Sequence, residues 1–219
     1  DEVNIYYQKA YVEPSNGAVL GYNHFPKGLA ERGLRRGDAA AKAAVQLLLS
    51  NGVFMVTGDM SFANGDLPAY GNGGSRECSY VLQTFVEAER LGISLSSAQL
   101  ARRAQCFQWC LDHIDQFTPP AYGGNGTCDF YRPFLGGITS HVLIEYNTYV
   151  DPPDNRIVEY IKRLCDYTWD SCWLPASQAF TYTDRETGDP TGDLLPQVDL
   201  NMLVMPMFAW IWYQTGEQS

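Results

Sequence analysis

The chain has 219 residues, 45% of them hydrophobic and 18% charged, which is the composition of a globular protein with a sizeable core and excludes a disordered chain. Its formal net charge is −10 at pH 7 and its pI is near 4.6. A surface this acidic repels the phosphates of nucleic acids and anionic membranes, so we expect neither as a partner.

The N-terminal part of the chain predicts a lead-in followed by a helical hairpin. Residues 1–23 mix β-branched and aromatic residues with turn formers, which indicates a strand-like or irregular segment. Pro26 suits the first turn of a helix, and Gly37 ends that helix. Asp38 then caps a second helix that runs to Ser50.

A second hairpin is predicted after a polar loop over 53–74. Ser75 is a favourable N-cap for a helix that Gly92 stops. The Ser96-Ser97 pair caps the next helix, which continues to about Phe117.

A third hairpin is predicted after a glycine-rich loop. A helix over 133–149 is joined by the tight turn 151–154 to a helix over 156–169. A long loop over 174–197 follows, with a short β-hairpin around residues 179–182.

The last predicted helix, Asp199 to about Thr215, is apolar on several faces. We therefore expect it to be buried on more than one side. Part of it can also serve an interface, which is compatible with an oligomer or a larger assembly. The longest apolar run, Leu203 to Trp212, is too short to span a bilayer and is interrupted by Pro206, so no membrane insertion is expected.

The predicted fold class is all-α. Helical hairpins with short turns alternate with long loops, so helices of alternating direction would bring all long loops to one end of the array. We expect a single domain over 1–219, with the hairpin array over 24–215. Function usually collects on such long loops.

The six cysteines are an even number and form no CxxC motif. Together with the glycosylation triplet Asn125-Gly126-Thr127, they favour disulfides and a secreted or cell-surface location. Ordinary buried thiols are the alternative. The three histidines lie far apart and no EF-hand spacing occurs, so neither a metal nor a cofactor is expected.

Two of the predicted hairpins share the order helix, Gly/Asp turn, helix and long loop. In the first, Val86–Leu91 closes a helix before Gly92, and Ser96-Ser97 begins the next helix. In the second, Pro133–Gly137 begins a helix, Asp151-Pro152 forms the turn, and Asp166–Trp169 closes the partner helix. This order resembles the α/α-toroid proteins, the six-hairpin glycosidases and related polysaccharide lyases. About three and a half hairpins are predicted here where a closed toroid has six, so the array is a partial or small toroid. The resemblance implies a polysaccharide or oligosaccharide ligand in a groove at the long-loop end.

Polar residues occupy the helix starts at that end, and two of them are candidates for hydrolysis. Glycosidic hydrolysis needs two carboxylates across a cleft, for which we select Glu77 and Asp199. Each also lies in a first helical turn, where a carboxylate complements the helix dipole without any catalytic role.

The stretch around the first helix start offers a different chemistry. The resemblance to the toroid lyases implies that His24 or Tyr22 takes a proton, while Asn23 and a clamp from Arg76 or Arg132 neutralise a uronic acid carboxylate. The alternative is a histidine that only hydrogen-bonds a neighbouring loop.

Further polar and aromatic residues are candidates for substrate binding. Tyr70, Tyr122 and Tyr131 can stack on sugar rings, or pack their loops onto helix ends. Asn201 can contact substrate, or act as a cap of the last helix. The leading function is therefore a secreted, glycoside hydrolase-like protein that cleaves or binds a polysaccharide. The alternatives are a polysaccharide lyase and a non-catalytic extracellular binding or assembly module.

Overall fold

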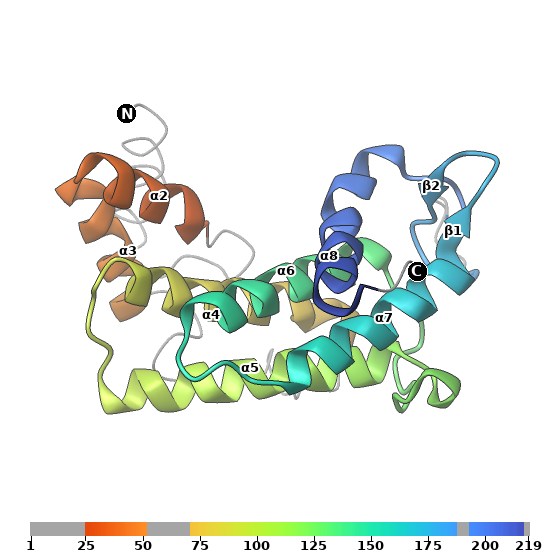
Figure 1. Ribbon diagram of the computed structural model, residues 1–219, viewed down its shortest axis with the longest axis horizontal. Coiled ribbons are helices and arrows are strands. Elements are labelled where there is room, and N and C mark those ends of the chain that lie inside the picture. Colours follow the sequence, from red (N-terminus) through yellow and green to blue (C-terminus); the bar gives the residue numbers. More distant parts are fainter. Residues whose placement is uncertain (1–24, 52–70, 188–192, 217–219) are drawn as a thin grey trace. The chain divides into compact units, whose positions relative to one another are not determined.

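The protein is described by a computed structural model over residues 25–51, 71–187 and 193–216 (Figure 1). These residues form seven α-helices and one two-stranded sheet, which confirms the predicted all-α class. The lead-in predicted for residues 1–23 lies outside the described residues.

The helices have short connections within three pairs, as predicted. The elements are α2 (Pro26–Arg36), α3 (Ala39–Asn51), α4 (Gly71–Arg90), α5 (Ser97–Phe117), the 3-10 turn η4 (Pro120–Tyr122), α6 (Pro133–Tyr149), α7 (Arg156–Cys172), β1 (Trp173–Leu174), β2 (Ala179–Phe180), the 3-10 turn η5 (Val198–Leu200) and α8 (Asn201–Thr215). An ordered array of the three hairpins, and with it the toroid resemblance, stays a prediction.

The chain groups into two compact units. Of the described residues, unit 1 comprises 25–51, 76–108 and 145–153, and unit 2 comprises 71–75, 109–144, 154–187 and 193–216. Each unit has its own apolar core. The core of unit 1 includes Leu29, Val45, Leu48, Val81, Leu82, Phe85 and Phe107, and that of unit 2 includes Leu111, Ile114, Phe117, Tyr131, Leu164, Phe180 and Phe208.

The turn between α2 and α3 forms as the sequence predicts. Gly37 ends α2 in the left-handed region with φ 63°. Asp38 accepts hydrogen bonds from the backbone N–H groups of Ala40 and Ala41 at 2.9 and 3.1 Å, so it caps α3. Arg32 also donates to Asp38 at 2.5 Å. The two helices of this hairpin are thus fixed by one carboxylate.

The next turn carries a reciprocal cap. Ser96 accepts from the backbone N–H of Gln99 at 3.3 Å, and the Gln99 side chain accepts from the Ser96 N–H at 2.8 Å. At the start of α4 the prediction was wrong, because this helix begins at Gly71 and not after Ser75. Ser75 is buried inside the helix, and a buried position in the core overrides its local preference for a cap.

In unit 2, α7 continues one turn beyond the predicted end at Trp169 and passes directly into β1. β1 pairs antiparallel with β2, with Trp173 opposite Phe180 and Leu174 opposite Ala179. The predicted β-hairpin is therefore present, but its first strand lies earlier than expected. This short hairpin packs on α7 and α8 through Trp169, Phe180 and Phe208.

Helix α8 differs from its prediction. Only one face is buried, formed by Val204, Met207, Phe208 and Ile211, whereas Met202 is 82% exposed and Tyr213 is 80% exposed. Apolar residues occur all around this helix, so their spacing does not tell whether one face or several faces are buried. The prediction from the sequence therefore overestimated the burial of α8.

The cysteines give the predicted disulfides no support. All six lie in the described part of the chain and none is in a disulfide. The Cys78 thiol donates to the Cys106 carbonyl, and the Cys128 thiol to the Phe130 carbonyl. The argument for an oxidising compartment is weaker as a result, and the extracellular location stays a prediction. Within the part of the chain that the structure describes, no helix has the length and apolarity needed to cross a membrane.

Candidate functional site

Four predicted site residues, Tyr22, Asn23, His24 and Tyr70, lie outside the described residues. The proposed lyase base and its amide partner are among them. The remaining predicted residues fall in the two units, Arg76 and Glu77 in unit 1 and the others in unit 2.

Glu77 and Arg76 bind each other. The Arg76 guanidinium donates to one Glu77 oxygen at 3.0 Å, and the Glu77 side chain is 5% exposed. The other oxygen, Oε2, is buried with no hydrogen-bond partner among the described residues. This is an ion pair between a buried carboxylate and a partly exposed arginine, near the start of α4, rather than a carboxylate that faces a cleft.

Tyr131 and Arg132 hold the loop before α6. The Tyr131 ring is fully buried, and its hydroxyl bonds the Thr168 hydroxyl at 2.9 Å. The half-buried Arg132 lies over the rings of Phe130 and Tyr182, about 5 Å from each ring centre. A sugar ring therefore has no access to Tyr131, and Arg132 packs against aromatic rings of its own loops.

Asp199 and Asn201 lie at the start of the last helix. Asp199 is exposed in the short turn η5. The Asn201 amide accepts from the Phe180 N–H at 3.1 Å and donates to the Gln178 carbonyl at 3.0 Å. Asn201 thus ties the β1–β2 hairpin to α8, which is a structural role.

Tyr122 is the predicted residue that lies beside accessible polar and aromatic groups. Its hydroxyl donates to Asp170 of α7 at 2.9 Å, and its ring lies 5.2 Å from that of Tyr167. The hydrogen bond to the Asp170 carboxylate raises the pKa of Tyr122 above its usual value. Arg163 fixes the loop of Tyr122 by donating to the Gly123 carbonyl at 2.8 Å.

Asp170 belongs to a row of residues that we call the α7 stripe. The stripe consists of Asp166, Trp169, Asp170 and Trp173. Positions three and four apart on a helix share a face, so these side chains are neighbours. Asp170 is exposed, and Asp166 accepts from Lys162 at 3.0 Å. Carboxylates and indole rings thus alternate along one surface of unit 2.

The two indoles of the α7 stripe are held in a fixed stack. The ring centres of Trp169 and Trp173 lie 5.0 Å apart with an angle of 13° between the planes. Phe180 and Phe208 contact Trp169 edge-on from the core side. Trp169 nevertheless remains 39% exposed. A large apolar ring that packs on three aromatic neighbours is thereby partly presented to solvent.

The sequence analysis did not select Trp169, Asp170 or Trp173 as site residues. A signal was available. Asp166 and Asp170, like Trp169 and Trp173, are separated by four residues, so two acids and two indoles repeat on one helical face.

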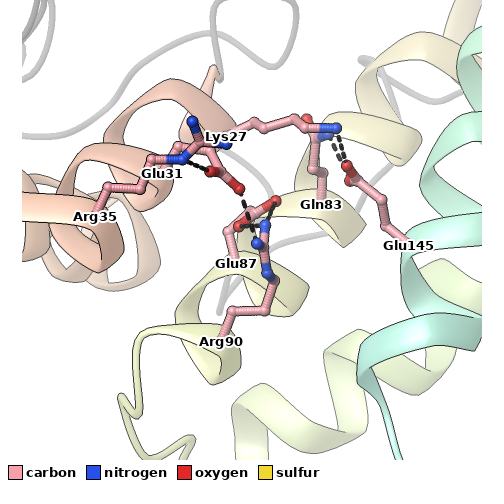
Figure 2. Close-up of polar contacts among 7 residues, drawn as sticks. All are labelled: Lys27, Glu31, Arg35, Gln83, Glu87, Arg90 and Glu145. Carbon is pink, nitrogen blue, oxygen red and sulfur yellow. Dashed lines mark hydrogen bonds and ion pairs between the residues drawn. The ribbon is translucent and has the colours of Figure 1, made fainter.

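Unit 1 contains a second group of polar residues, which we call the α4 charge cluster (Figure 2). Its members are Lys27, Glu31, Gln83, Glu87, Arg90 and Glu145. Arg90 donates to both oxygens of Glu87 at 2.9 and 2.7 Å, and to Glu31 of α2 at 2.8 Å. Lys27 of α2 forms an ion pair with Glu145 of α6. The cluster thus links α2 to α4 and α6.

Glu87 is a strongly perturbed carboxyl of this cluster. Its side chain has no exposed surface, and burial raises its pKa to about 7, with a further rise from the neighbouring charge of Glu145 and an opposing effect of Arg90. A raised carboxyl pKa is typical of a catalytic acid. A catalytic acid must also reach its substrate, and Glu87 is enclosed with both oxygens bound to Arg90. Its geometry is that of a structural buried ion pair.

Neither site contains the ligands of a metal centre. Among the described residues, no group of three or more His, Cys, Asp and Glu side chains is placed to hold a metal ion. The α7 stripe consequently has the features of a surface for binding a polar ring compound, with aromatic faces for stacking and carboxylates as hydrogen-bond acceptors.

Comparison with known proteins gives no relative on which to base an assignment. No protein-family model, no curated protein and no solved structure matches this chain.

Proposed function

We propose that the protein binds carbohydrate on the α7 stripe, with Tyr122 at its edge. The observation that carries the proposal is the stacked pair of Trp169 and Trp173, with Trp169 exposed beside the exposed carboxylate of Asp170. A pyranose ring offers an apolar C–H face and a rim of hydroxyl groups. An indole face and an adjacent carboxylate are the complementary groups.

The charges of this surface favour a neutral sugar over a uronic acid. Asp166 and Asp170 both lie on the α7 stripe, and among the described residues only Asp166 has a cationic partner, Lys162. The carboxylate of a uronic acid placed on Trp169 would be repelled by the negative charge of Asp170, with no neighbouring cation of the stripe to offset the repulsion. The whole chain, at −10, adds to that repulsion. Neutral polysaccharides are therefore the proposed ligand class, and this supports the binding function over the lyase alternative.

Binding, rather than cleavage, is what this arrangement supports. Hydrolysis requires a carboxyl on each side of the scissile bond. Asp166 and Asp170 are neighbours on the same face of α7, and each already accepts a hydrogen bond, from Lys162 and Tyr122 respectively. Both carboxylates would contact a sugar from one side. The function that we propose is therefore that of a binding module. A polysaccharide ligand agrees with a secreted or cell-surface location.

The test is calorimetric titration of the chain with neutral oligosaccharides of glucose, mannose and xylose, and with oligogalacturonate. At least one neutral oligosaccharide should bind, and more tightly than oligogalacturonate. Trp169→Ala and Asp170→Ala should each weaken that binding at least tenfold. Trp212→Ala removes an exposed indole of α8 outside the stripe and should leave binding unchanged. If no oligosaccharide binds, or if binding survives both stripe substitutions in folded protein, the proposal is wrong.

A further inference from the structure

Helix α8 presents an exposed apolar face, which we call the α8 stripe. It consists of Met202, Met205, Ala209, Trp212 and Tyr213, all exposed. Their spacings of three and four residues place them on one side of the helix. The exposed fractions are 48% for Met205 and 56% for Trp212, in addition to the values for Met202 and Tyr213. A continuous apolar face of this kind marks an interaction surface.

The chemistry of α8 limits what can cover this stripe. None of the 15 residues from Asn201 to Thr215 is charged, although the chain as a whole carries −10. A charged partner would gain no ion pair there. Two copies of this acidic chain repel each other over most of their surfaces, and an uncharged face is where they can meet without bringing carboxylates together.

We propose that the α8 stripe is a homodimer interface, in which it packs antiparallel against the α8 stripe of a second copy and crosses it at Ala209. In a pair related by a two-fold axis through Ala209, a residue of one copy faces the residue of the other copy that lies the same number of positions from Ala209 in the opposite direction. Ala209 then faces itself. The small side chain at the crossing lets the two helices approach closely, since interaxial distance depends on the side chains at the contact.

The side chains on either side of Ala209 are complementary in this arrangement. Met205 of one copy lies against Tyr213 of the other, four residues from the centre on each side. This is a thioether–aromatic contact, which is favourable. Pro206 in the same way faces Trp212. A parallel pair would instead place Trp212 on Trp212 and Tyr213 on Tyr213, with the flexible methionines together at the opposite end. Tyrosine, tryptophan and methionine are also the residue types enriched at protein interfaces.

Sedimentation velocity over a range of concentrations tests the oligomeric state. The 219-residue chain should reach a dimer as concentration rises. Ala209→Glu places two like charges against each other at the crossing, on an exposed helical position that tolerates glutamate, and should raise the dissociation constant at least tenfold. Ala209→Lys should do the same. A 1:1 mixture of the two variants should recover the dimer through opposite charges. A chain that stays monomeric at all concentrations, or variants that dimerise as well as the unchanged protein, would overturn the proposal.

Cross-linking tests the antiparallel geometry. Under mild oxidation Ala209→Cys should give a disulfide-linked dimer, since each copy faces itself there. Tyr213→Cys alone should not, whereas a mixture of Met205→Cys and Tyr213→Cys should. The unchanged chain, with its six native thiols, is the background control. A dimer that forms efficiently from Tyr213→Cys alone would show a parallel pair and contradict the proposed interface.

Discussion

Arg90 donates to both carboxylate oxygens of Glu87, at 2.9 and 2.7 Å, although the Glu87 side chain is entirely buried. The same guanidinium binds Glu31, so one largely buried cation serves two carboxylates. A buried carboxylate that shares its partner loses hydration without full compensation, and the pKa of Glu87 rises from 4.5 to about 7 accordingly.

The stability of unit 1 should therefore depend on pH around neutrality. The folded protein binds the Glu87 proton more tightly than the unfolded chain does. The resulting stabilisation is fully present below pH 4.5 and is lost as pH rises through 7. A pKa difference of about 2.5 units corresponds to at most about 3 kcal/mol. Urea unfolding followed by far-UV circular dichroism at pH 5 and pH 8 measures it, and Glu87→Gln should remove the difference.

Glu31 provides a control of opposite sign. Its hydrogen bond from Arg90 lowers its pKa, so its contribution is present above pH 4.5 and is lost as pH falls. Glu31→Gln should leave the change between pH 5 and pH 8 in place. An unaltered pH slope in Glu87→Gln would show that another group is responsible. All five tryptophans lie in unit 2, so fluorescence recorded in parallel should report the unfolding of that unit alone.

A second prediction concerns the ion pair of Lys27 with Glu145. The Glu145 carboxylate is 7% exposed, and Gln83 donates to its other oxygen at 2.8 Å. Lys27→Met leaves the negative charge of this carboxylate without its ion-pair partner and should lower the free energy of unfolding by about 1–2 kcal/mol. The loss is smaller than for a fully buried ion pair, because Lys27 is 43% exposed. Adding Glu145→Gln should recover about 1 kcal/mol of that loss.

Denaturant unfolding of the two single variants and the double variant gives the coupling energy. Lys42→Met on the exposed side of α3 is the matched control, expected within about 0.5 kcal/mol of the unchanged protein. Strictly additive effects of the Lys27 and Glu145 substitutions would contradict the interaction.

A third prediction concerns the contact of α6 with α8. A Cβ added at Gly137 would lie 2.2 Å from the Leu203 carbonyl oxygen, a backbone atom of α8. The two helices can pack this closely only because Gly137 has no side chain. Gly137→Ala should therefore destabilise unit 2 by about 1–3 kcal/mol, measured by tryptophan fluorescence in urea. Gly28 on α2 has open space around it, and Gly28→Ala should stabilise unit 1 by about 0.5–1 kcal/mol. Equal effects at both positions would contradict this packing.

A fourth prediction separates thiols from the disulfides expected from the sequence. All six cysteines should react with a thiol reagent in denaturant without added reductant. In the native protein the buried thiols should react slowly. Burial raises the pKa of Cys172 to about 12, so little of its reactive thiolate exists at neutral pH. A count of two or fewer reactive thiols in denaturant would restore the disulfide prediction and the oxidising compartment that it implies.

The sequence predicted the helices well where a local signal exists. Gly37 with Asp38, and Ser96 with Gln99, are turn and cap signals that act within a few residues, and the structure places helix ends there. Ser75 carries the same signal but is buried within α4, because core packing from distant residues decides its environment. The residues next to Ser75 in the sequence do not determine that packing, so the cap signal alone could not predict it.

The candidate sites were harder to predict for the same reason. Tyr131 and Asn201 have the residue types of a sugar site, yet their partners Thr168 and Phe180 lie 37 and 21 residues away in the chain. No periodic pattern reveals such pairings. The α4 charge cluster likewise joins Lys27 to Glu145, which are 118 residues apart. The α7 stripe could be predicted from the sequence, because Asp166, Trp169 and Asp170 share one face of α7 and Trp173 follows directly after that helix.

The measurement that tests the carbohydrate-binding surface most directly is the nuclear magnetic resonance signal of the five indole N–H groups during titration with the neutral oligosaccharide that binds most tightly. Trp169→Phe and Trp173→Phe assign the two resonances of the α7 stripe. We predict that these two shift along the titration while those of Trp109 and Trp210 stay in place. Stationary Trp169 and Trp173 resonances at saturating sugar would contradict binding at this surface.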